Sequence, residues 1–140
     1  MKILAAVDGS PYTKRMLAYL AAHDEWLGAQ HQYTLLHCAP AVPPRAAAVI
    51  AKADLKAYYD DETEKVFKPI RTFFNRQGLQ ATFVAKVGPA AELIAATADK
   101  GGFDLLVMGS HGQGSLVNLV MGSVATKVLA RTKVPVLLIR

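Results

Sequence analysis

The sequence predicts an α/β fold in which a parallel β-sheet is covered by helices on both faces. Strand-like and helix-like stretches alternate along the chain, which is typical of such a sheet. Residues 3–7 form a short, continuous apolar run, as expected for a central strand that is buried on both sides. With 140 residues, of which 52% are hydrophobic, we expect one domain, residues 1–140, with a sizeable core.

The individual elements follow from the apolar periodicity and from the glycines and prolines that interrupt it. The expected strands are residues 3–7, 33–38, 81–87, 103–108 and 134–139. The expected helices begin at Ser10–Pro11, cover residues 52–76, run from after Gly88–Pro89 to Gly101–Gly102, and cover residues 123–131.

Particular residues support these boundaries. Ser10 is suited to the N-cap of the first helix, and Pro11 is suited to its first turn. The prolines of residues 39–45 predict a loop after the second strand. Apolar residues recur at spacings of three, four and seven through residues 52–76, where Pro69 should kink the helix or mark a shift of register.

The stretch of residues 108–124, MGSHGQGSLVNLVMGSV, carries the pattern that is most specific for function. Gly109 and Gly112 follow a buried-looking strand, where glycines allow positive φ angles and bring backbone N–H groups close to a ligand. Gly122 and Ser123 open the last helix, whose free N–H groups and positive dipole end attract anions. Together these elements predict a cradle for an anion such as phosphate.

Two familiar phosphate-binding loops do not match this stretch. A Walker A loop ends in Gly-Lys-Ser/Thr, whereas Gly114 is followed by Ser115 with no lysine. The dinucleotide-binding fingerprint would begin at Gly112, but Val117 stands where its third glycine belongs, and the stretch lies late in the chain.

At these residues the chain resembles the nucleotide-binding branch of the universal stress protein family. That branch carries the pattern G-x2-G-x9-G-[S/T], which Gly109, Gly112, Gly122 and Ser123 match in full. The resemblance covers nearly the whole chain, through the segments ILAAVDGSPYTKRML, YTLLHCAP, VGPAAELIAATA and VPVLLIR. The family often has a second small hydroxyl residue two positions later, where this chain has Ala125. That departure removes one possible hydrogen bond to a phosphate, whose net contribution is on the order of 0.5–1.5 kcal/mol.

The resemblance implies both a fold and a function. The fold is a three-layer sandwich with a five-stranded sheet of order 3-2-1-4-5 and two helices on each face. The function is binding of ATP, or of ADP or AMP, by a regulatory module of the stress response, with Mg²⁺ arriving on the triphosphate. The residues implied in nucleotide binding are Ala6, Val7, Asp8, Cys38, Met108, Gly109, His111, Gly112, Gly122, Ser123, Val124 and Ala125.

Asp8 follows the first strand, and ligands of parallel sheets bind at the carboxyl ends of the strands. If the first and fourth strands are neighbours, Asp8 and Gly109 face the same crevice. The resemblance implies that the Asp8 carboxylate accepts hydrogen bonds from ribose or adenine. The alternative is an aspartate that caps the turn into the first helix. We favour the ligand role because the residue lies at the switch point of the sheet.

Several other candidates keep two interpretations. If the resemblance holds, the small apolar residues Ala6, Val7 and Cys38 line a flat slot for adenine; otherwise they are plain core. His111 either donates a hydrogen bond to a phosphate or is a loop residue tolerated for its polar tip. Ser123 either binds a terminal phosphate, directly or through Mg²⁺, or caps its own helix.

The sequence shows no designed catalytic centre. It has no P-loop lysine and no clear general base, and the spacing of its four histidines does not suit a metal site. Cys38 adjoins His37, but adjacent strand residues point to opposite faces, so no activated thiolate is expected. Asp8 and Ser123 are too few to bind Mg²⁺ without nucleotide. We expect at most slow ATP hydrolysis.

Composition and charge bound the location and the partners. No apolar run approaches the ~20 residues needed to cross a membrane. Asp8 interrupts the first apolar run, so no secretory leader is expected and we expect a cytoplasmic protein. The single cysteine excludes an internal disulfide and suits that reducing compartment. The net charge of +5 comes from scattered basic residues, so we expect no nucleic-acid partner.

Residues 134–139 are expected to mediate a homodimer. The chain ends at Arg140, directly after this apolar strand, which leaves the outer edge of the strand uncovered. The simplest cover is the same strand of a second copy, paired antiparallel about a twofold axis. The family resemblance suggests the same dimer.

Two other functions stay open at this point. One is an enzyme of the wider adenine-nucleotide-binding superfamily, a small hydrolase or transferase, although 140 residues leave little room for further substrate-binding elements. The other is a nucleotide-independent dimeric interaction protein whose glycine loop is vestigial. Nucleotide recovered from the purified, denatured protein would argue against the second.

Overall fold

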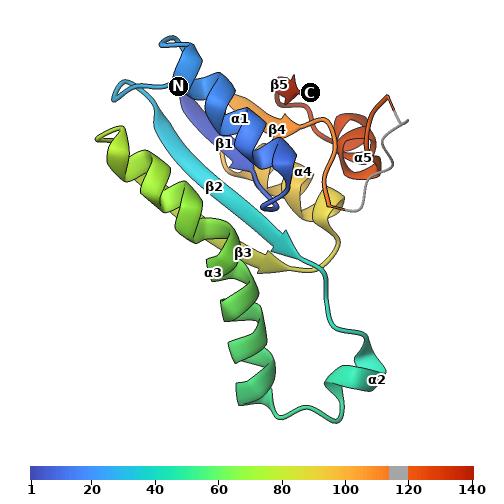
Figure 1. The fold of residues 1–140 in the computed structure, drawn as a ribbon. Coiled ribbons are helices and arrows are strands. Elements are labelled where there is room, and N and C mark those ends of the chain that lie inside the picture. Colours follow the sequence, from blue (N-terminus) through green and yellow to red (C-terminus); the bar gives the residue numbers. More distant parts are fainter. Residues whose placement is uncertain (114–119) are drawn as a thin grey trace.

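The computed structural model describes residues 1–113 and 120–140 and shows a five-stranded parallel sheet (Figure 1). The strand order is β3-β2-β1-β4-β5, as the family resemblance implies. The strands are β1 (Lys2–Ala6), β2 (Gln32–Ala39), β3 (Ala81–Val87), β4 (Leu105–Gly109) and β5 (Val136–Ile139). The helices are α1 (Pro11–Ala22), α2 (Pro44–Ala47), α3 (Lys52–Arg76), α4 (Ala90–Lys100) and α5 (Ser123–Arg131).

Helices cover both faces of the sheet, which confirms the predicted three-layer sandwich. Residues of α1 and α3 pack with Ile3 in the core on one face. Residues of α4 and α5 pack with Leu4 in the core on the other face (Figure 1). Ile3 and Leu4 serve opposite cores because successive side chains of a strand alternate between the two faces.

The register of the strands brings three chain segments to one edge of the sheet. Ala6 at the end of β1 pairs with Leu36 of β2 and with Met108 of β4. Because all strands run in the same direction, the residues that follow them emerge together at this edge. The strand order reverses at β1, which lies between β2 and β4, and ligands of open α/β sheets bind at such a point.

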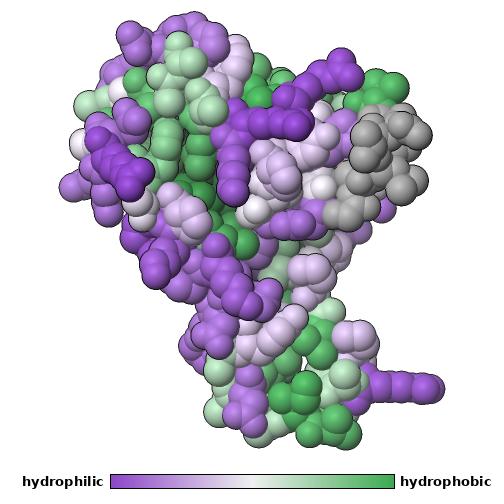
Figure 2. Space-filling model, viewed as in Figure 1, coloured by the Kyte–Doolittle hydropathy of each residue, from purple (hydrophilic) through white to green (hydrophobic). Residues whose placement is uncertain are grey.

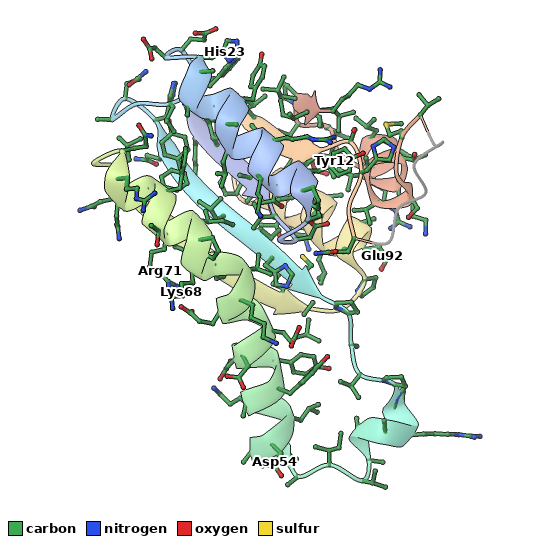
Figure 3. All side chains as sticks on the ribbon, viewed as in Figure 1. Tyr12, His23, Asp54, Lys68, Arg71 and Glu92 are labelled. Atoms are coloured by element: carbon green, nitrogen blue, oxygen red, sulfur yellow. The ribbon has the colours of Figure 1, made fainter. Side chains whose placement is uncertain are left out.

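The first half of α3 extends beyond the sheet. The buried residues of this helix, Phe67, Ile70 and Phe74, all lie in its second half. Residues 40–62, which include α2, form a projecting arm, with Asp54 at its tip (Figures 1 and 3). Val49 is 85% exposed, and hydrophobic residues gather at this end of the molecule (Figure 2). In the described part of the chain, no helix combines the length and apolar character needed to cross a membrane.

Three predicted boundaries are wrong. The predicted loop of residues 39–45 runs into the short helix α2. The last strand begins at Val136, two residues later than predicted, because Pro135 has no N–H and the Val134 N–H donates to Thr132 Oγ1 at 3.2 Å. Strand β4 also begins two residues later than predicted, at Leu105, and the remaining strand ends agree with the prediction to within one residue.

The start of α1 is closed differently from the prediction. Ser10 occupies the N-cap position, but its hydroxyl makes no capping hydrogen bond and is buried without a partner among the described residues. Thr13 Oγ1 closes the turn instead, since it accepts the N–H groups of Asp8 and Gly9, each at 3.2 Å. Pro69 lies inside α3, and the helix continues through it.

Candidate functional site

A cavity of about 240 Å³ lies at the carboxyl ends of β1, β2 and β4, beside the start of α5. Its volume lies just below the range of about 300–1,000 Å³ that is typical of small-molecule sites. Every residue that the sequence predicted for nucleotide binding lines this cavity. These residues are Ala6, Val7, Asp8, Cys38, Met108, Gly109, His111, Gly112, Gly122, Ser123, Val124 and Ala125.

The cavity has further lining residues that the sequence did not reveal. Leu36 lies two positions before Cys38 and shares its face of β2, so strand alternation could have identified it. The approach of α4 to the sheet depends on tertiary packing and has no local signal. The residues that the prediction missed are Thr13, Leu36, His37, Pro40, Ala90, Ile94 and Gln113.

The apolar end of the cavity is a slot between the sheet and α4. Leu36, Met108 and Ile94 belong to one buried core cluster, and Ala6 packs against it. Ala6 lies between Leu36 and Met108 on the neighbouring strands. Its small side chain leaves space between larger neighbours, which suits a flat apolar group such as a base.

Cys38 lines this slot as a protonated thiol. Burial raises the pKa of the Cys38 thiol to about 11, an effect that the nearby Lys86 partly offsets. A thiol with this pKa is protonated near neutral pH and is therefore a weak nucleophile. His37 packs on the opposite face, with its ring centroid 6.2 Å from that of Phe67. His37 and Cys38 therefore face opposite sides of β2, as strand alternation predicts.

Asp8 shows the turn-capping contacts that the sequence left as an alternative. Its Oδ1 accepts hydrogen bonds from the Ser10 N–H at 2.9 Å and from Thr13 Oγ1 at 3.1 Å. Its Oδ2 accepts the Gln113 N–H at 3.1 Å, which joins the glycine loop to the end of β1. A carboxylate has about four acceptor positions, so one remains for a ligand. The ligand role of Asp8 stays a prediction.

The described loop glycines allow neighbouring segments to approach the backbone closely, and they do not adopt unusual backbone angles. Neither Gly109 nor Gly112 has a positive φ angle, so this part of the expectation is wrong. A Cβ atom on Gly109 would lie 2.7 Å from Tyr12 Cβ, and one on Gly112 would lie 2.5 Å from Asp8 Oδ2. A side chain at either position would therefore displace a neighbour, the backbone of α1 at Gly109 or the Asp8 carboxylate at Gly112.

The start of α5 forms the other side of the polar end. Gly122 is the N-cap, with ordinary φ and ψ angles of −71° and 161°, so its backbone is open to any residue. Its N–H donates to the Ser110 carbonyl oxygen at 2.7 Å, which ties the helix to the glycine loop. The first turn of α5 contains no acidic residue, and the Ser123 side chain in that turn is exposed. This helix end is suited to an anion.

Ser110 and Tyr12 contact His111 at the rim of the polar end. His111 Nδ1 lies 2.8 Å from Ser110 Oγ, and the imidazole ring centroid lies 4.9 Å from that of Tyr12. Tyr12 lies at the start of α1 (Figure 3), and Arg15 Cζ lies 4.7 Å from the centroid of its ring. These contacts place the imidazole beside the cavity, within the part of the loop that the structure describes.

Two features complete the description of the site. Gly114, Ser115 and Val117, which exclude a Walker A loop and the dinucleotide fingerprint, lie outside the described residues. Among residues 1–113 and 120–140, no three His, Cys, Asp or Glu side chains come together in a group that could hold a metal ion.

Comparison with known proteins identifies relatives of the chain. It is 32% identical over 138 residues to a universal stress protein of Thermus aquaticus, which covers 99% of this chain and 97% of that protein. It is 34% identical over 82 residues to the stress response protein NhaX of Bacillus subtilis, covering 59% of this chain and 49% of that protein. The chain thus spans about half the length of NhaX, and 42% of the universal stress protein Slr1230 of Synechocystis, to which it is 29% identical over 148 residues.

Solved structures share the fold. Protein MJ0577 of Methanocaldococcus jannaschii superposes with a TM-score of 0.78 at 24% identity, covering 99% of this chain and 94% of that chain. A universal stress protein family protein from Arabidopsis thaliana with AMP bound has a TM-score of 0.70 at 17% identity, covering 99% and 90%. The universal stress protein from Archaeoglobus fulgidus in complex with dAMP has a TM-score of 0.69 at 20% identity, covering 100% and 98%.

The family model described as universal stress protein family matches residues 1–140. The fold, the strand order and the relatives agree with this match. The chain belongs to the universal stress protein family.

Proposed function

We propose that this protein binds an adenine nucleotide, ATP in the first instance, and acts as a regulatory module of the stress response. The observation that carries the proposal is the meeting of an apolar slot, a glycine loop and a helix N-terminus in one cavity. An adenine nucleotide needs an apolar surface for its base, and a glycine loop beside a helix N-terminus suits its phosphates.

In this proposal the slot binds the base and the start of α5 binds the phosphates. Leu36, Met108 and Ile94 form an apolar surface for the base. The start of α5, without an acidic residue in its first turn, favours the negative charge of phosphates. The AMP and dAMP bound by proteins of the same fold support this assignment.

Magnesium enters with the triphosphate in this proposal. Asp8 already accepts hydrogen bonds from Ser10, Thr13 and Gln113, so it has little capacity left for a cation. The exposed Ser123 hydroxyl is a natural ligand for a Mg²⁺ that the phosphates also hold. We expect tighter ATP binding with Mg²⁺ and negligible Mg²⁺ binding by the apo protein, both measured by calorimetry.

The nucleotide itself provides the direct test. Protein purified without added nucleotide is denatured, and the supernatant is analysed by ion-exchange chromatography and mass spectrometry. We expect adenine nucleotide in the supernatant and binding of added ATP to the stripped, refolded protein. Absence of both would refute the proposal and would favour an interaction protein with a vestigial loop.

We also propose a cytoplasmic homodimer that pairs through β5. In the described part of the chain, β5 ends the sheet order and no strand lies beyond it. Leu137 and Leu138 are only partly buried in the single chain, and an open apolar edge strand is normally covered. The free thiol of Cys38 suits the reducing cytoplasm.

Sedimentation tests the dimer. We expect the mass of two chains at micromolar concentration, and a monomer or insoluble protein for Leu138→Lys, because a charge on the paired edge opposes association. Lys127→Ala, a change on the exposed part of α5, is the control and should remain dimeric. A wild-type mass of one chain would refute the proposed pairing.

A further inference from the structure

A second cavity, of about 540 Å³, lies beside the first at the base of the projecting arm. One wall is the end of β2 at Ala39 with the segment that follows it, residues 40–43, and the opposite wall is α3 between residues 58 and 66. Asp8, His37 and Gln113 line both cavities, so the two spaces meet at the carboxyl end of β1.

A specific hydrogen bond joins the two walls of the second cavity. The Val42 N–H donates to the Tyr59 hydroxyl at 2.7 Å, which fixes the segment after β2 against α3. The neighbouring Tyr58 ring, with its centroid 5.7 Å from that of Tyr59, is 51% exposed. An exposed aromatic ring at the wall of a cavity offers a surface on which another ring can pack.

His37 places an unpaired acceptor between the two cavities. Its Nδ1 lies 3.0 Å from the Val7 carbonyl oxygen, which can only accept, so Nδ1 carries the proton and donates it. In the neutral imidazole Nε2 is then an acceptor, and it has no partner among residues 1–113 and 120–140. His37 as a whole is only 7% exposed. Among the described side chains, the nitrogen or oxygen atom that is shielded from solvent and lacks a hydrogen-bond partner is Ser10 Oγ, so His37 Nε2 is not shielded in this way. Nε2 is therefore reached from the cavities.

The charges of the second cavity select against an anion. Lys65 and Glu62 neutralise each other across 3.0 Å, which leaves the carboxylate of Asp8 as the unbalanced charge. Together with the acceptor on His37, this environment suits a neutral group that carries hydroxyl or N–H donors. A sugar or a nucleoside has these properties, whereas a phosphate does not.

We propose that the second cavity receives a neutral sugar or nucleoside linked to the terminal phosphate of a nucleotide in the first cavity. The ligand class is then a pyrophosphate-bridged adenine dinucleotide or nucleotide sugar, and a hydroxyl of its second half donates to His37 Nε2. Gln113 directly follows Gly112 of the glycine loop and borders both cavities, so a group attached to the phosphates passes Asp8 into the second space. The inference rests on the proposed adenine-nucleotide site.

Calorimetry with ADP and ADP-ribose tests the proposal, because ADP-ribose carries a neutral ribose on the terminal phosphate of ADP, and the variants below show whether the second cavity causes the difference in affinity. We expect ADP-ribose to bind wild-type protein about tenfold more tightly than ADP. In His37→Asn the amide nitrogen replaces Nδ1 toward Val7, but nothing reaches the position of Nε2. The ratio of the two dissociation constants should therefore fall to within about twofold of one.

Tyr58→Ala provides a second variant that removes an exposed ring from the second cavity alone. It should keep the affinity for ADP and lower the preference for ADP-ribose about threefold. If circular dichroism shows that His37→Asn does not fold, Tyr58→Ala alone tests the proposal.

The outcomes separate the two proposals. Equal affinities of wild-type protein for ADP and ADP-ribose would overturn the second site while leaving the nucleotide site intact. A tenfold preference that survives both substitutions would also overturn it. Failure of both ligands to bind would refute the nucleotide site, and the extended ligand with it.

Discussion

The two ends of the first cavity are built in different ways. At the apolar end, Leu36 and Met108 belong to adjacent strands and to the core, with exposed fractions of 0% and 4%. At the polar end, a few hydrogen bonds tie the glycine loop, such as two from Gln113 to Asp8 and one from the Gly122 N–H to the Ser110 carbonyl oxygen. Substitutions at the apolar end should therefore change stability, whereas substitutions at the polar end should change ligand affinity.

Leu36→Ala has the largest expected effect and tests the apolar end. Removing this fully buried side chain should lower the free energy of unfolding by about 2–5 kcal/mol, because transfer energy is lost and a cavity is left. Urea denaturation measures the change. The control is Val124→Ala, which lines the same cavity from the exposed start of α5 and should change stability by about 0.5 kcal/mol or less. A cost below 1 kcal/mol for Leu36→Ala, as an order of magnitude, would contradict the comparison.

The reactivity of the Cys38 thiol is a second test of the apolar end. Because the pKa of its thiol is raised from 9.0 to about 11, alkylation by iodoacetamide at pH 8 should be roughly 100-fold slower in folded than in urea-unfolded protein. As the pH rises, the thiol ionises in the unfolded chain before it ionises in the folded chain. The stability that the protonated thiol contributes is therefore present below pH 9 and is lost as the pH rises toward 11. Equal alkylation rates in the two states would show that the slot is open.

Gly112→Ala tests the polar end. The new methyl group would lie 2.5 Å from Asp8 Oδ2, so either the glycine loop or the Asp8 carboxylate must shift, and both border the polar end. We expect the affinity for ATP to fall about tenfold or more, while the free energy of unfolding changes by less than about 1 kcal/mol. Calorimetry with ATP and with adenosine provides the control, because adenosine uses mainly the apolar end. A loss of stability without a loss of affinity would reverse the assignment of this residue.

His111→Ala should have the smallest effect. The imidazole lies at the rim, and a water molecule can replace the single hydrogen bond that it offers to a phosphate. We expect ATP affinity to fall about threefold, less than for Gly112→Ala, in the same calorimetric experiment. An equal or greater loss for His111→Ala would make the histidine a principal phosphate ligand.

Local patterns in the sequence were sufficient to predict much of this fold. Strand β3, helix α3 and helix α5 have the predicted boundaries, because periodicity and flanking glycines mark such elements directly. The start of β5 was missed because its ladder depends on the bonds that Val134 and Pro135 can make to neighbouring segments. Hydrogen-bond partners of this kind are set by the assembled structure.

The sequence by itself determined the glycine pattern of Gly109, Gly112, Gly122 and Ser123, which is encoded at short spacing, and the family resemblance implied the other predicted lining residues of the first cavity. Only the tertiary structure decided how they meet. Asp8 and Gln113 are 105 positions apart, and their contact exists because β1 and β4 are neighbours in the sheet. The same holds for His37, whose unpaired Nε2 becomes visible only when α3 and the projecting arm enclose a second cavity. Contacts between distant segments depend on how whole layers pack, and no local spacing records that choice.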